Sequence, residues 1–412
     1  MERMDALTTP LPKGWKKVRL GDILELLTDY HANGSYEILK NNVTLLKNVD
    51  FAIMIRTTNF ENNDFKNDLI YIDKKAYEFL SKSKVFAGDI LVNKIANAGT
   101  AYFMPKLNQP VSLGMNLFLL RIKPSYNNLF IFKQIANYER VLKTFANGSA
   151  TKTITKNVIK NLLIPLPPLN EQIAIANILS DVDRYLYSLD ALILKKESVK
   201  KALSFELLSQ RKRLKGFNQA WQRVRLGDIC EFGNGGAYET LIVENGDFKL
   251  ISLNSIDIDG NLKNTMKRVN FYDNSLKQDD IVMVLSDVAH GDFLGLCAVI
   301  PNNDYVLNQR MGRLRKKNDC INILFLRLYI NANQKYFKMQ GQGSSQLNLS
   351  KKAIEDFEIL LPPLNEQIAI ANILSGLDHE IISLKNKKRQ FENIKKALNH
   401  DLMSAKIKVL NK

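Results

Sequence analysis

The sequence predicts an α+β fold in which two α/β domains are separated by two long antiparallel coiled-coil helices, arranged as an internal pseudo-twofold repeat. Three observations predict this fold. A segment of 15 residues occurs twice without a change, each copy begins a long heptad pattern, and short apolar strands occupy the residues before each copy. With 412 residues, 45% of them hydrophobic, the chain can form several globular cores, which excludes a disordered protein.

The duplicated segment, LPPLNEQIAIANILS, occupies residues 166–180 and again 361–375. A second repeated segment opens each half, because residues 15–23 match residues 221–229. The segments between these anchors, 24–164 and 230–360, have diverged, so two common frames carry two different inserts. Drift after duplication is the simpler explanation, but exchange of one insert by recombination explains better why the frames are unchanged. We predict α/β domains at 1–164 and 217–360, and helical segments at 165–216 and 361–412.

The first long helix is predicted to run from Asn170 to Lys215. Pro167 and Pro168 end the preceding extended segment, and Asn170 is a suitable N-cap. Glu171 lies in the first turn, where a carboxylate faces the positive end of the helix dipole. Gly216 follows a basic last turn and is a typical stop signal.

Apolar residues then follow a 4-3 spacing that is typical of a coiled-coil seam. The seam residues are Ile175, Leu179, Val182, Leu186 and Leu189 in the first helix, and Ile370, Leu374, Leu377, Ile381 and Leu384 in the second. Lysines interrupt both seams further along, at positions 196, 200, 388 and 395. They either fix the register of pairing or extend to solvent at a locally open spot, and the sequence leaves both open. Acids gather at the start and bases at the end of the helices, which favours antiparallel pairing.

Each insert shows short apolar strands separated by turns rich in Asn, Asp and Gly, for example at 89–92, 116–121, 249–253, 280–284 and 295–300. One apolar helical stretch follows in each insert, at 129–142 and 321–339. After it comes a loop of Gly and Ser, at 147–153 and 341–346, and then a short helix near 155–161 and 350–356. The recurrence of this loop with different side chains raises the prospect of a functional contact, although a solvated turn is the ordinary alternative.

The formal net charge of +16 favours a polyanionic partner, most often nucleic acid, although an anionic membrane or general Lys usage also accounts for it. Arg, Asn and Gln bind base edges bidentately, and small polar residues contact phosphates. Taken singly, each such residue is more often an ordinary surface residue. The candidate DNA-binding residues are Arg56, Thr57, Thr58, Asn59, Lys94, Ser149, Thr151, Lys152, Asn254, Gln309, Arg310, Arg313, Ser344, Ser345 and Gln346.

No catalytic motif emerges from the sequence. It contains neither a GxxxxGK[ST] phosphate loop, nor the Asp/Asn-Pro-Pro-Tyr/Phe tetrapeptide of amino-methylating DNA enzymes, nor HExxH. The four histidines are scattered, and the three cysteines are too far apart for a CxxC site, which indicates a reducing compartment without a bound metal. There is no uncharged apolar run of about 20 residues and no signal-peptide core. We therefore expect a cytoplasmic, non-catalytic protein.

The doubled Pro-Leu-Pro-Pro-Leu-Asn-Glu-Gln helix start, the preceding Gly-Ser loop and the Trp-x-x-Val-x-Leu-Gly-Asp-Ile opening resemble the specificity subunit of type I restriction-modification systems, the HsdS family. The resemblance covers residues 15 to about 408. It implies that each insert is a target-recognition domain for one half of an asymmetric bipartite DNA site. The two helices would then form a spacer of fixed length.

The resemblance also implies partners. Two methyltransferase subunits, which carry S-adenosylmethionine, would dock on the helices, and two motor-endonuclease subunits would join them for restriction. The chain itself would bind no cofactor. Two rival functions stay open at this stage, namely a coiled-coil scaffold without a DNA role and a self-contained DNA-modifying enzyme.

Overall fold

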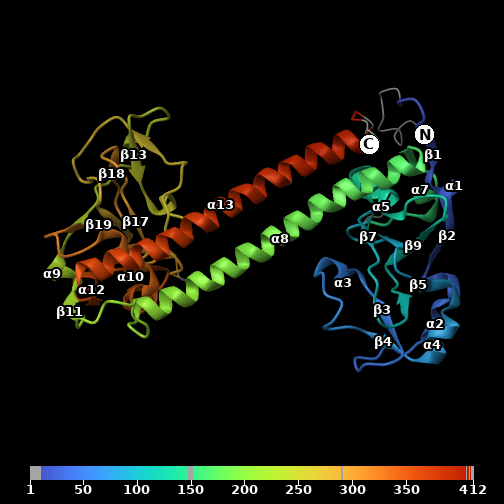
Figure 1. The fold of residues 1–412 in the computed structure, drawn as a ribbon, viewed down its shortest axis with the longest axis horizontal. Helices are drawn as coiled ribbons and strands as arrows, with labels where there is room; N and C mark the ends of the chain where they lie inside the picture. The colour runs from blue at the N-terminus through green and yellow to red at the C-terminus, as the bar shows by residue number, and fades with distance from the viewer. Residues whose placement is uncertain (1–10, 147–151, 289–290, 405, 408, 410–412) are drawn as a thin grey trace. The chain divides into compact units, whose positions relative to one another are not determined.

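The computed structural model describes residues 11–146, 152–288, 291–404, 406–407 and 409 (Figure 1). The chain divides into two compact units. Unit 1 comprises residues 1–188 and 388–412, and unit 2 comprises residues 189–387. Each unit therefore combines one α/β domain with the beginning of one long helix and the end of the other. The boundaries predicted at residues 164, 216 and 360 follow the sequence repeat and stay predictions.

Unit 1 contains two four-stranded sheets and one two-stranded sheet. The strand orders are β2-β9-β6-β7, β4-β3-β8-β5 and β1-β10. Among the described strands of unit 1, only β3 and β8 pair in parallel. The strands are β1 (Lys16–Arg19), β2 (Leu24–Asp29), β3 (Ala52–Ile55), β4 (Tyr71–Ile72), β5 (Lys84–Val85), β6 (Ile90–Asn93), β7 (Ala101–Phe103), β8 (Val111–Leu113), β9 (Leu117–Ile122) and β10 (Leu163–Leu166). The helices are α1 (Leu20–Ile23), η2 (Tyr30–Asn33), α2 (Tyr36–Asn42), α3 (Thr57–Glu61), α4 (Lys74–Phe79), η3 (Ser81–Ser83), α5 (Asn128–Asn137), α6 (Glu139–Thr144), α7 (Lys156–Lys160) and the start of α8 (Leu169–Leu208).

Unit 2 repeats this topology, although its insert has diverged in sequence. Its strand orders are β12-β19-β15-β17, β14-β13-β18, β11-β21 and β16-β20, and β13 pairs with β18 in parallel as β3 does with β8. The strands are β11 (Gln222–Arg225), β12 (Cys230–Asn234), β13 (Phe248–Ile251), β14 (Arg268–Val269), β15 (Ile281–Val284), β16 (Ser286–Val288), β17 (Cys297–Val299), β18 (Tyr305–Leu307), β19 (Met311–Lys316), β20 (Gln346–Asn348) and β21 (Glu358–Leu361). The helices are α9 (Leu226–Ile229), η4 (Glu239–Leu241), η5 (Leu253–Ser255), α10 (Ile323–Ala332), α11 (Gln334–Gln340), α12 (Lys351–Glu355) and the start of α13 (Leu364–Met403). The duplication therefore extends through the inserts.

An ion pair inside each sheet illustrates the shared structure. Arg121 binds Asp89 through two nitrogen–oxygen contacts of 2.9 and 2.8 Å in unit 1. Arg315 binds Asp280 in the same way in unit 2, at 2.8 and 2.6 Å. Both carboxylates are buried, so each pair replaces the lost hydration of its carboxylate with bidentate hydrogen bonds.

The long helices α8 and α13 each span 40 residues. The prediction that the first helix reaches Lys215 is wrong, because α8 ends at Leu208. Leu207 and Leu208 are buried in the core of unit 2, and Gln210 adopts a left-handed conformation with φ of 61°. Gln210 thus has the left-handed conformation that the sequence suggested for Gly216, which lies eight residues beyond the end of the helix.

Each predicted apolar helical stretch is also wrong as a single helix, because both are broken. The first is divided into α5 and α6 at Tyr138, and the second into α10 and α11 at Asn333. Both residues leave helical backbone geometry, with ψ of 7° and 22°. The Asn333 amide also donates to the carbonyl of Tyr329 at 2.8 Å, a side-chain bond that competes with helix continuation.

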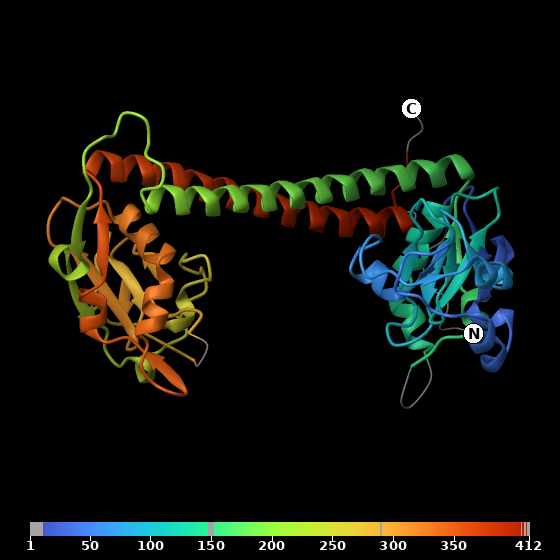
Figure 2. The ribbon, with the colours of Figure 1, turned by 90° about the horizontal axis from the view of Figure 1, so that it is seen from below.

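The long helices pair antiparallel within each unit, as predicted. In unit 1 the ring centroids of Tyr185 and Phe391 lie 4.5 Å apart, and Figures 1 and 2 show the start of α8 beside the end of α13. In unit 2 the end of α8 contacts the start of α13, because Lys196 binds Glu380 at 2.8 Å and Lys200 binds Asp378. The start of one helix therefore lies beside the end of the other in both units.

Three of the seam lysines form ion pairs with the facing helix. Lys196 and Lys200 reach carboxylates on the facing helix in unit 2, and Lys395 binds Asp183 at 2.6 Å in unit 1. Lys200–Asp378 and Lys395–Asp183 are the same pair at equivalent positions of the repeat. These contacts match one particular alignment of the helices, so they favour a register role over simple extension to solvent.

The predicted seam residues are all at least half-buried. Those that are fully buried are Ile175, Leu179, Leu189, Ile370, Leu374 and Ile381, and those that are half-buried are Val182, Leu186, Leu377 and Leu384. None of the helices in the described part of the chain has the length and hydropathy that crossing a bilayer requires.

Candidate nucleic-acid interface

The repeated motif holds each α/β domain on its long helix through a Trp–Glu contact. Trp15 Nε1 donates to Glu171 Oε2 at 3.2 Å, and Trp221 Nε1 donates to Glu366 Oε2 at 3.0 Å. The sequence suggested only that these glutamates face the helix dipole. Glu366 is fully buried and also accepts from Arg213 at 3.1 Å, which raises the pKa of the guanidinium. The motif therefore joins the two conserved anchors of each half.

The glutamine after this glutamate holds the start of a helix that precedes the motif in the chain, α5 in unit 1 and α10 in unit 2. Gln172 Oε1 accepts from the backbone N–H of Asn127, and Gln367 Oε1 accepts from that of Asn322, at 2.9 and 2.8 Å. Both glutamines are buried. Gln172 Nε2 donates to the carbonyl of Pro167, and Gln367 Nε2 donates to that of Pro362, each at 2.8 Å. Asn127 and Asn322 cap α5 and α10, so the frame sets where these helices begin.

Candidate residues of unit 1 follow the carboxyl end of β3. Asn59 is buried, and its Oδ1 accepts from the Arg56 backbone N–H at 2.9 Å, so Asn59 caps α3 locally. Arg56 Nη2 donates to the carbonyl of Asp68 at 2.9 Å, whereas Arg56 Nε and Thr57 Oγ1 are buried without a hydrogen-bond partner among the described residues. Thr58 is exposed. Arg56, Thr57 and Thr58 therefore keep capacity for further hydrogen bonds.

The equivalent turn of unit 2 follows β13. Ser255 Oγ accepts from the Ser252 backbone N–H at 2.9 Å, as Asn59 does from Arg56. Asn254 is exposed at the position that Thr58 occupies in unit 1. The two turns thus share a backbone conformation and differ in the side chain they present.

Two other candidates of unit 2 lie between β18 and β19. Gln309 is half-buried, and its backbone N–H donates to the carbonyl of Gly236 at 2.6 Å. Arg310 is exposed, with a left-handed φ of 68° that turns the chain into β19. Its carbonyl accepts from the backbone N–H of Leu285, just after β15, at 3.0 Å.

Arg313 lies within β19 and is already engaged. Its guanidinium donates to Glu231 at 2.8 Å and to the carbonyl of Ser275 at 3.1 Å. Lys94 is similarly engaged in unit 1. Its ammonium lies 3.3 Å from Asp29, and only 9% of the residue is exposed. Neither head group is directed to solvent as a base-reading side chain would be.

The Gly-Ser loop of unit 2 leads into β20. Ser344 and Ser345 are exposed, and Gln346 Nε2 donates to Ser286 Oγ at 2.8 Å. In unit 1, Ser149 and Thr151 lie outside the described residues, and Lys152 is exposed. Thr153 forms a β-bridge with Ile95, and this bridge is the counterpart in unit 1 of the pairing between β16 and β20 in unit 2.

Most of these segments meet at one edge of each α/β domain. In unit 2, the backbone N–H of Asn308 donates to Ile251 at the end of β13, and that of Leu349 donates to Leu285 after β15, at 3.0 and 2.8 Å. In unit 1, Gly114 donates to Ile55 and Ile154 donates to Lys94, at 2.9 and 3.1 Å. We call this the recognition edge: residues 56–59, 114–116 and 152–153 in unit 1, and residues 252–255, 308–310 and 344–346 in unit 2.

Sequence reasoning missed the turn at 114–116 of this edge. Asn116 is exposed, and its carbonyl accepts from the backbone N–H of Lys94 at 2.8 Å. Arg310 does the same for Leu285, so Asn116 is the structural equivalent of Arg310. The turn before each strand is short and has no repeated sequence, and only the strand pairing reveals the correspondence.

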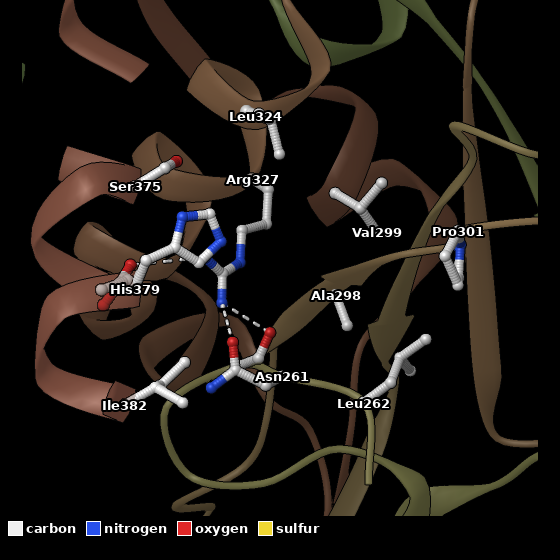
Figure 3. A pocket seen from close by; sticks show the side chains of 12 residues that line it. Asn261, Leu262, Ala298, Val299, Pro301, Leu324, Arg327, Ser375, His379 and Ile382 are labelled. Carbon is white, nitrogen blue, oxygen red and sulfur yellow. Dashed lines mark hydrogen bonds and ion pairs between the residues drawn. The ribbon is translucent and has the colours of Figure 1, made fainter. Parts of the chain in front are cut away.

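A pocket of about 370 Å³ in unit 2 lies where α10 and α13 meet the loop at 260–262 (Figure 3). Arg327 extends from α10 to that loop and donates to the carbonyl of Gly260 at 2.6 Å and to Asn261 Oδ1 at 3.2 Å. Its other nitrogen lies 3.9 Å from Asp378 of α13. Arg327 thus fastens the loop to the helix, and the rest of the lining is mostly apolar.

A family model described as type I restriction modification DNA specificity domain matches residues 12–196 and 218–393. The type I restriction enzyme MjaVIII specificity subunit of Methanocaldococcus jannaschii is 27% identical, over 97% of this chain and 95% of that protein. The crystal structure of the type I restriction-modification S subunit from M. genitalium has the same fold, with a TM-score of 0.62, 18% identity, and coverage of 97% of this chain and 98% of that one. A chain from a structure on complex assembly and conformational transition of the type I R-M system gives 0.54 at 17% identity, over 96% and 99%.

Proposed function

We propose that this chain is the DNA-recognition subunit of a type I restriction-modification complex. It belongs to the family of the type I restriction modification DNA specificity domain. Each α/β domain reads one half of a bipartite site. Because the two recognition edges present different side chains, the two half-sites differ and the whole site is asymmetric.

The observation that carries this proposal is the recognition edge, which occurs in both units at the same place in the fold. Equivalent positions carry Thr58 and Asn254 in one turn, and Asn116 and Arg310 in another, and all four are exposed. Asn pairs bidentately with adenine and Arg with guanine, whereas Thr contacts either base or the thymine methyl group. A common backbone with exchangeable side chains suits two domains that read different sequences.

We further assign methylation to partner methyltransferase subunits that bind S-adenosylmethionine, and cleavage to motor-endonuclease subunits. The relatives are named specificity subunits, and one structural neighbour comes from a study of complex assembly. The recognition edge offers hydrogen-bond donors and acceptors, which suit binding rather than bond breaking. The paired helices α8 and α13 are the proposed docking surface for the methyltransferase, and the complex would act on DNA in the cytoplasm.

The test is to produce the full chain with its neighbouring methyltransferase and to map methylated adenines across a genome. One bipartite, asymmetric motif is expected. Arg310→Ala should relax the bases of one half only, with a loss of about 1–3 kcal/mol in discrimination, and Asn116→Ala should relax only the other. The exposed Lys351→Ala, outside the edge, is the control and should leave the motif unchanged.

Other outcomes separate the rival functions. A contiguous palindromic motif, or relaxation of both halves by Arg310→Ala, would contradict separate half-site recognition. Methylation by the purified chain with S-adenosylmethionine alone would indicate a self-contained enzyme. A DNA-binding protein that contacts several phosphates should lose roughly 10³-fold or more in affinity between 50 and 200 mM salt. A chain that does not bind duplex DNA at any salt concentration would instead indicate a scaffold.

A further inference from the structure

Unit 1 contains a basic pocket of about 400 Å³ outside the recognition edge. Its lining residues come from β2, η2, η3, β5 and the residue after it, β9, and the start of α7. Lys82, Lys84, Arg121 and Lys156 line it, together with Phe86. Its size is within the range of small-molecule and cofactor sites, and four of its ten lining residues are cations.

The cations of this pocket exceed the carboxylates around it. Asp89 is nearly fully buried and is held by both nitrogens of Arg121. Asp29 lies between Lys156 Nζ and Lys94 Nζ, at 3.0 and 3.3 Å. Burial opposes the ionisation of Asp29, but the hydrogen bond from Lys156 and the charge of Lys94 outweigh it and lower its pKa. Both acids are thus neutralised by their own partners.

Two lysines are left for a ligand. Lys82 is exposed and Lys84 half-buried, and neither ammonium forms an ion pair within the described part of the chain. Lys84 Nζ lies only over the ring of Tyr77, 4.7 Å from its centroid. The exposed carboxylate of Glu25 is the remaining acid that interacts with Arg121, so the site stays positive when all three acids are counted.

Phe86 adds an aromatic surface to these cations. The residue is 53% exposed, and the Arg121 guanidinium lies 4.5 Å from its ring centroid, on one face. An exposed aromatic ring beside several cations suits a nucleotide, because a base stacks on the ring while the phosphate meets the lysines.

Unit 2 lacks this arrangement at the equivalent positions. The carbonyl of Ser275 accepts from Arg315 as that of Lys84 does from Arg121, so Ser275 occupies the place of Lys84. By the same correspondence Asp273 stands in the place of Lys82. Arg313 and its partner Glu231 lie against this region as well. The cations of the pocket are therefore a property of unit 1.

Asp29 also connects the pocket to the recognition edge. It ends β2 opposite Phe118, and its two oxygens are shared between Lys156, which lines the pocket, and Lys94, which contacts Asn116. A group bound at Lys156 would therefore lie next to the DNA-reading turn.

We propose that this pocket binds a phosphate group through Lys82 and Lys84, next to the Lys156–Asp29 pair, and that the phosphate is supplied either by the DNA backbone beside the first half-site or by a free nucleotide. The DNA source rests on the proposed function, and the nucleotide source does not. In the DNA case the pocket is a backbone clamp present on one half-site only. In the nucleotide case Phe86 stacks on the base.

The experiment compares the full chain, in complex with its methyltransferase, with Lys82→Glu/Lys84→Glu. The matched control is Lys277→Glu/Lys351→Glu, which makes the same charge change in the equivalent region of unit 2. Binding of the mapped duplex is measured from 50 to 200 mM salt, and binding of ATP and inorganic phosphate is measured separately. Fluorescence of Trp15 in the free chain carrying Trp221→Phe checks that unit 1 stays folded.

A DNA clamp predicts at least about a tenfold loss of duplex affinity and a salt slope reduced by about 1 to 2, with the control near wild type and no effect of Phe86→Ala. A free nucleotide predicts unchanged duplex binding, loss of ATP binding in Lys82→Glu/Lys84→Glu, and weaker ATP binding in Phe86→Ala. If duplex, ATP and phosphate all bind equally to the variant and to wild type, the proposal is overturned. If the wild-type complex fails to bind duplex, the proposed function fails, and the ATP and phosphate measurements decide on the pocket alone.

Discussion

Replacing Glu366 with alanine should destabilise unit 2 by about 3–5 kcal/mol, whereas the same change at Glu171 should destabilise unit 1 by only about 1 kcal/mol. The two glutamates are the same residue of the repeated motif, and both accept from a tryptophan. They differ in burial and in the number of partners. They therefore form a matched pair within one chain.

The magnitude follows from the local structure. Glu366 is fully buried and accepts from Trp221 and from two nitrogens of the half-buried Arg213, so its removal breaks three hydrogen bonds to a buried carboxylate, two of them in an ion pair. Such losses amount to about 3–5 kcal/mol. Glu171 is half-buried, and its one hydrogen bond within the described residues, from Trp15, is longer at 3.2 Å. A single hydrogen bond to a partly hydrated carboxylate contributes about 1 kcal/mol.

The assay uses the fact that the chain has two tryptophans, one in each unit. Trp15→Phe leaves Trp221 as a reporter of unit 2, and Trp221→Phe leaves Trp15 as a reporter of unit 1. Urea unfolding is followed by fluorescence in each background, with and without the glutamate substitution. Equal losses in the two units, or a larger loss for Glu171→Ala, would refute the argument that Arg213 and burial make Glu366 the stronger contact.

Three further predictions follow from the contacts between the helices and the domains. Burial opposes the ionisation of Asp183, but hydrogen bonds from Lys133 and Lys395 outweigh it and lower the pKa of Asp183. The free energy that this carboxylate adds to the stability of unit 1 is therefore present above about pH 4 and is lost as pH falls through the folded pKa. Asp183→Asn should reduce the loss of stability at low pH in urea unfolding followed by Trp15, and an unchanged loss would contradict the argument. A double-mutant cycle of Lys200→Ala and Asp378→Ala should give a coupling of about 0.5–1 kcal/mol by the Trp221 transition, and a value of zero would remove the register role of the pair. Arg327→Ala should release the loop at 260–262 and speed its amide hydrogen exchange, with that of β15 as an internal control; unchanged exchange in the loop would show that Arg327 does not hold it.

The sequence predicted what depends on local pattern and on repetition. The duplicated segments predicted the two-fold repeat, and the heptad spacing with its charge asymmetry predicted antiparallel helices, because both properties are written along one stretch of chain. The contact between Trp221 and Glu366 was not predicted, because it joins residues 145 positions apart that no local rule relates. For the same reason, nothing local showed that Gln210 rather than Gly216 would end α8.

The candidate site shows the same division. The segments at 56–59, 308–310 and 344–346 were found because their residue types suit base edges or phosphates. Lys94 and Arg313 were chosen on the same grounds, but the fold supplies each with a carboxylate, Asp29 or Glu231. Residue type alone predicts what a side chain can bind and does not predict which neighbour it meets first. Whether any of these residues contacts DNA stays a prediction.

The composition of the two units has a consequence for biosynthesis. Unit 2 is one continuous segment, residues 189–387, whereas the core of unit 1 is completed by Leu402 and Met403 at the end of α13. During translation, all of unit 2 leaves the ribosome before unit 1 has its last buried side chains. The N-terminal α/β domain therefore stays without part of its core until the chain is nearly finished, although its own residues are made first. A chain that stops before residue 402 leaves unit 1 with an open apolar face, which exposes prematurely ended products to proteolysis and chaperones before they can compete for partners.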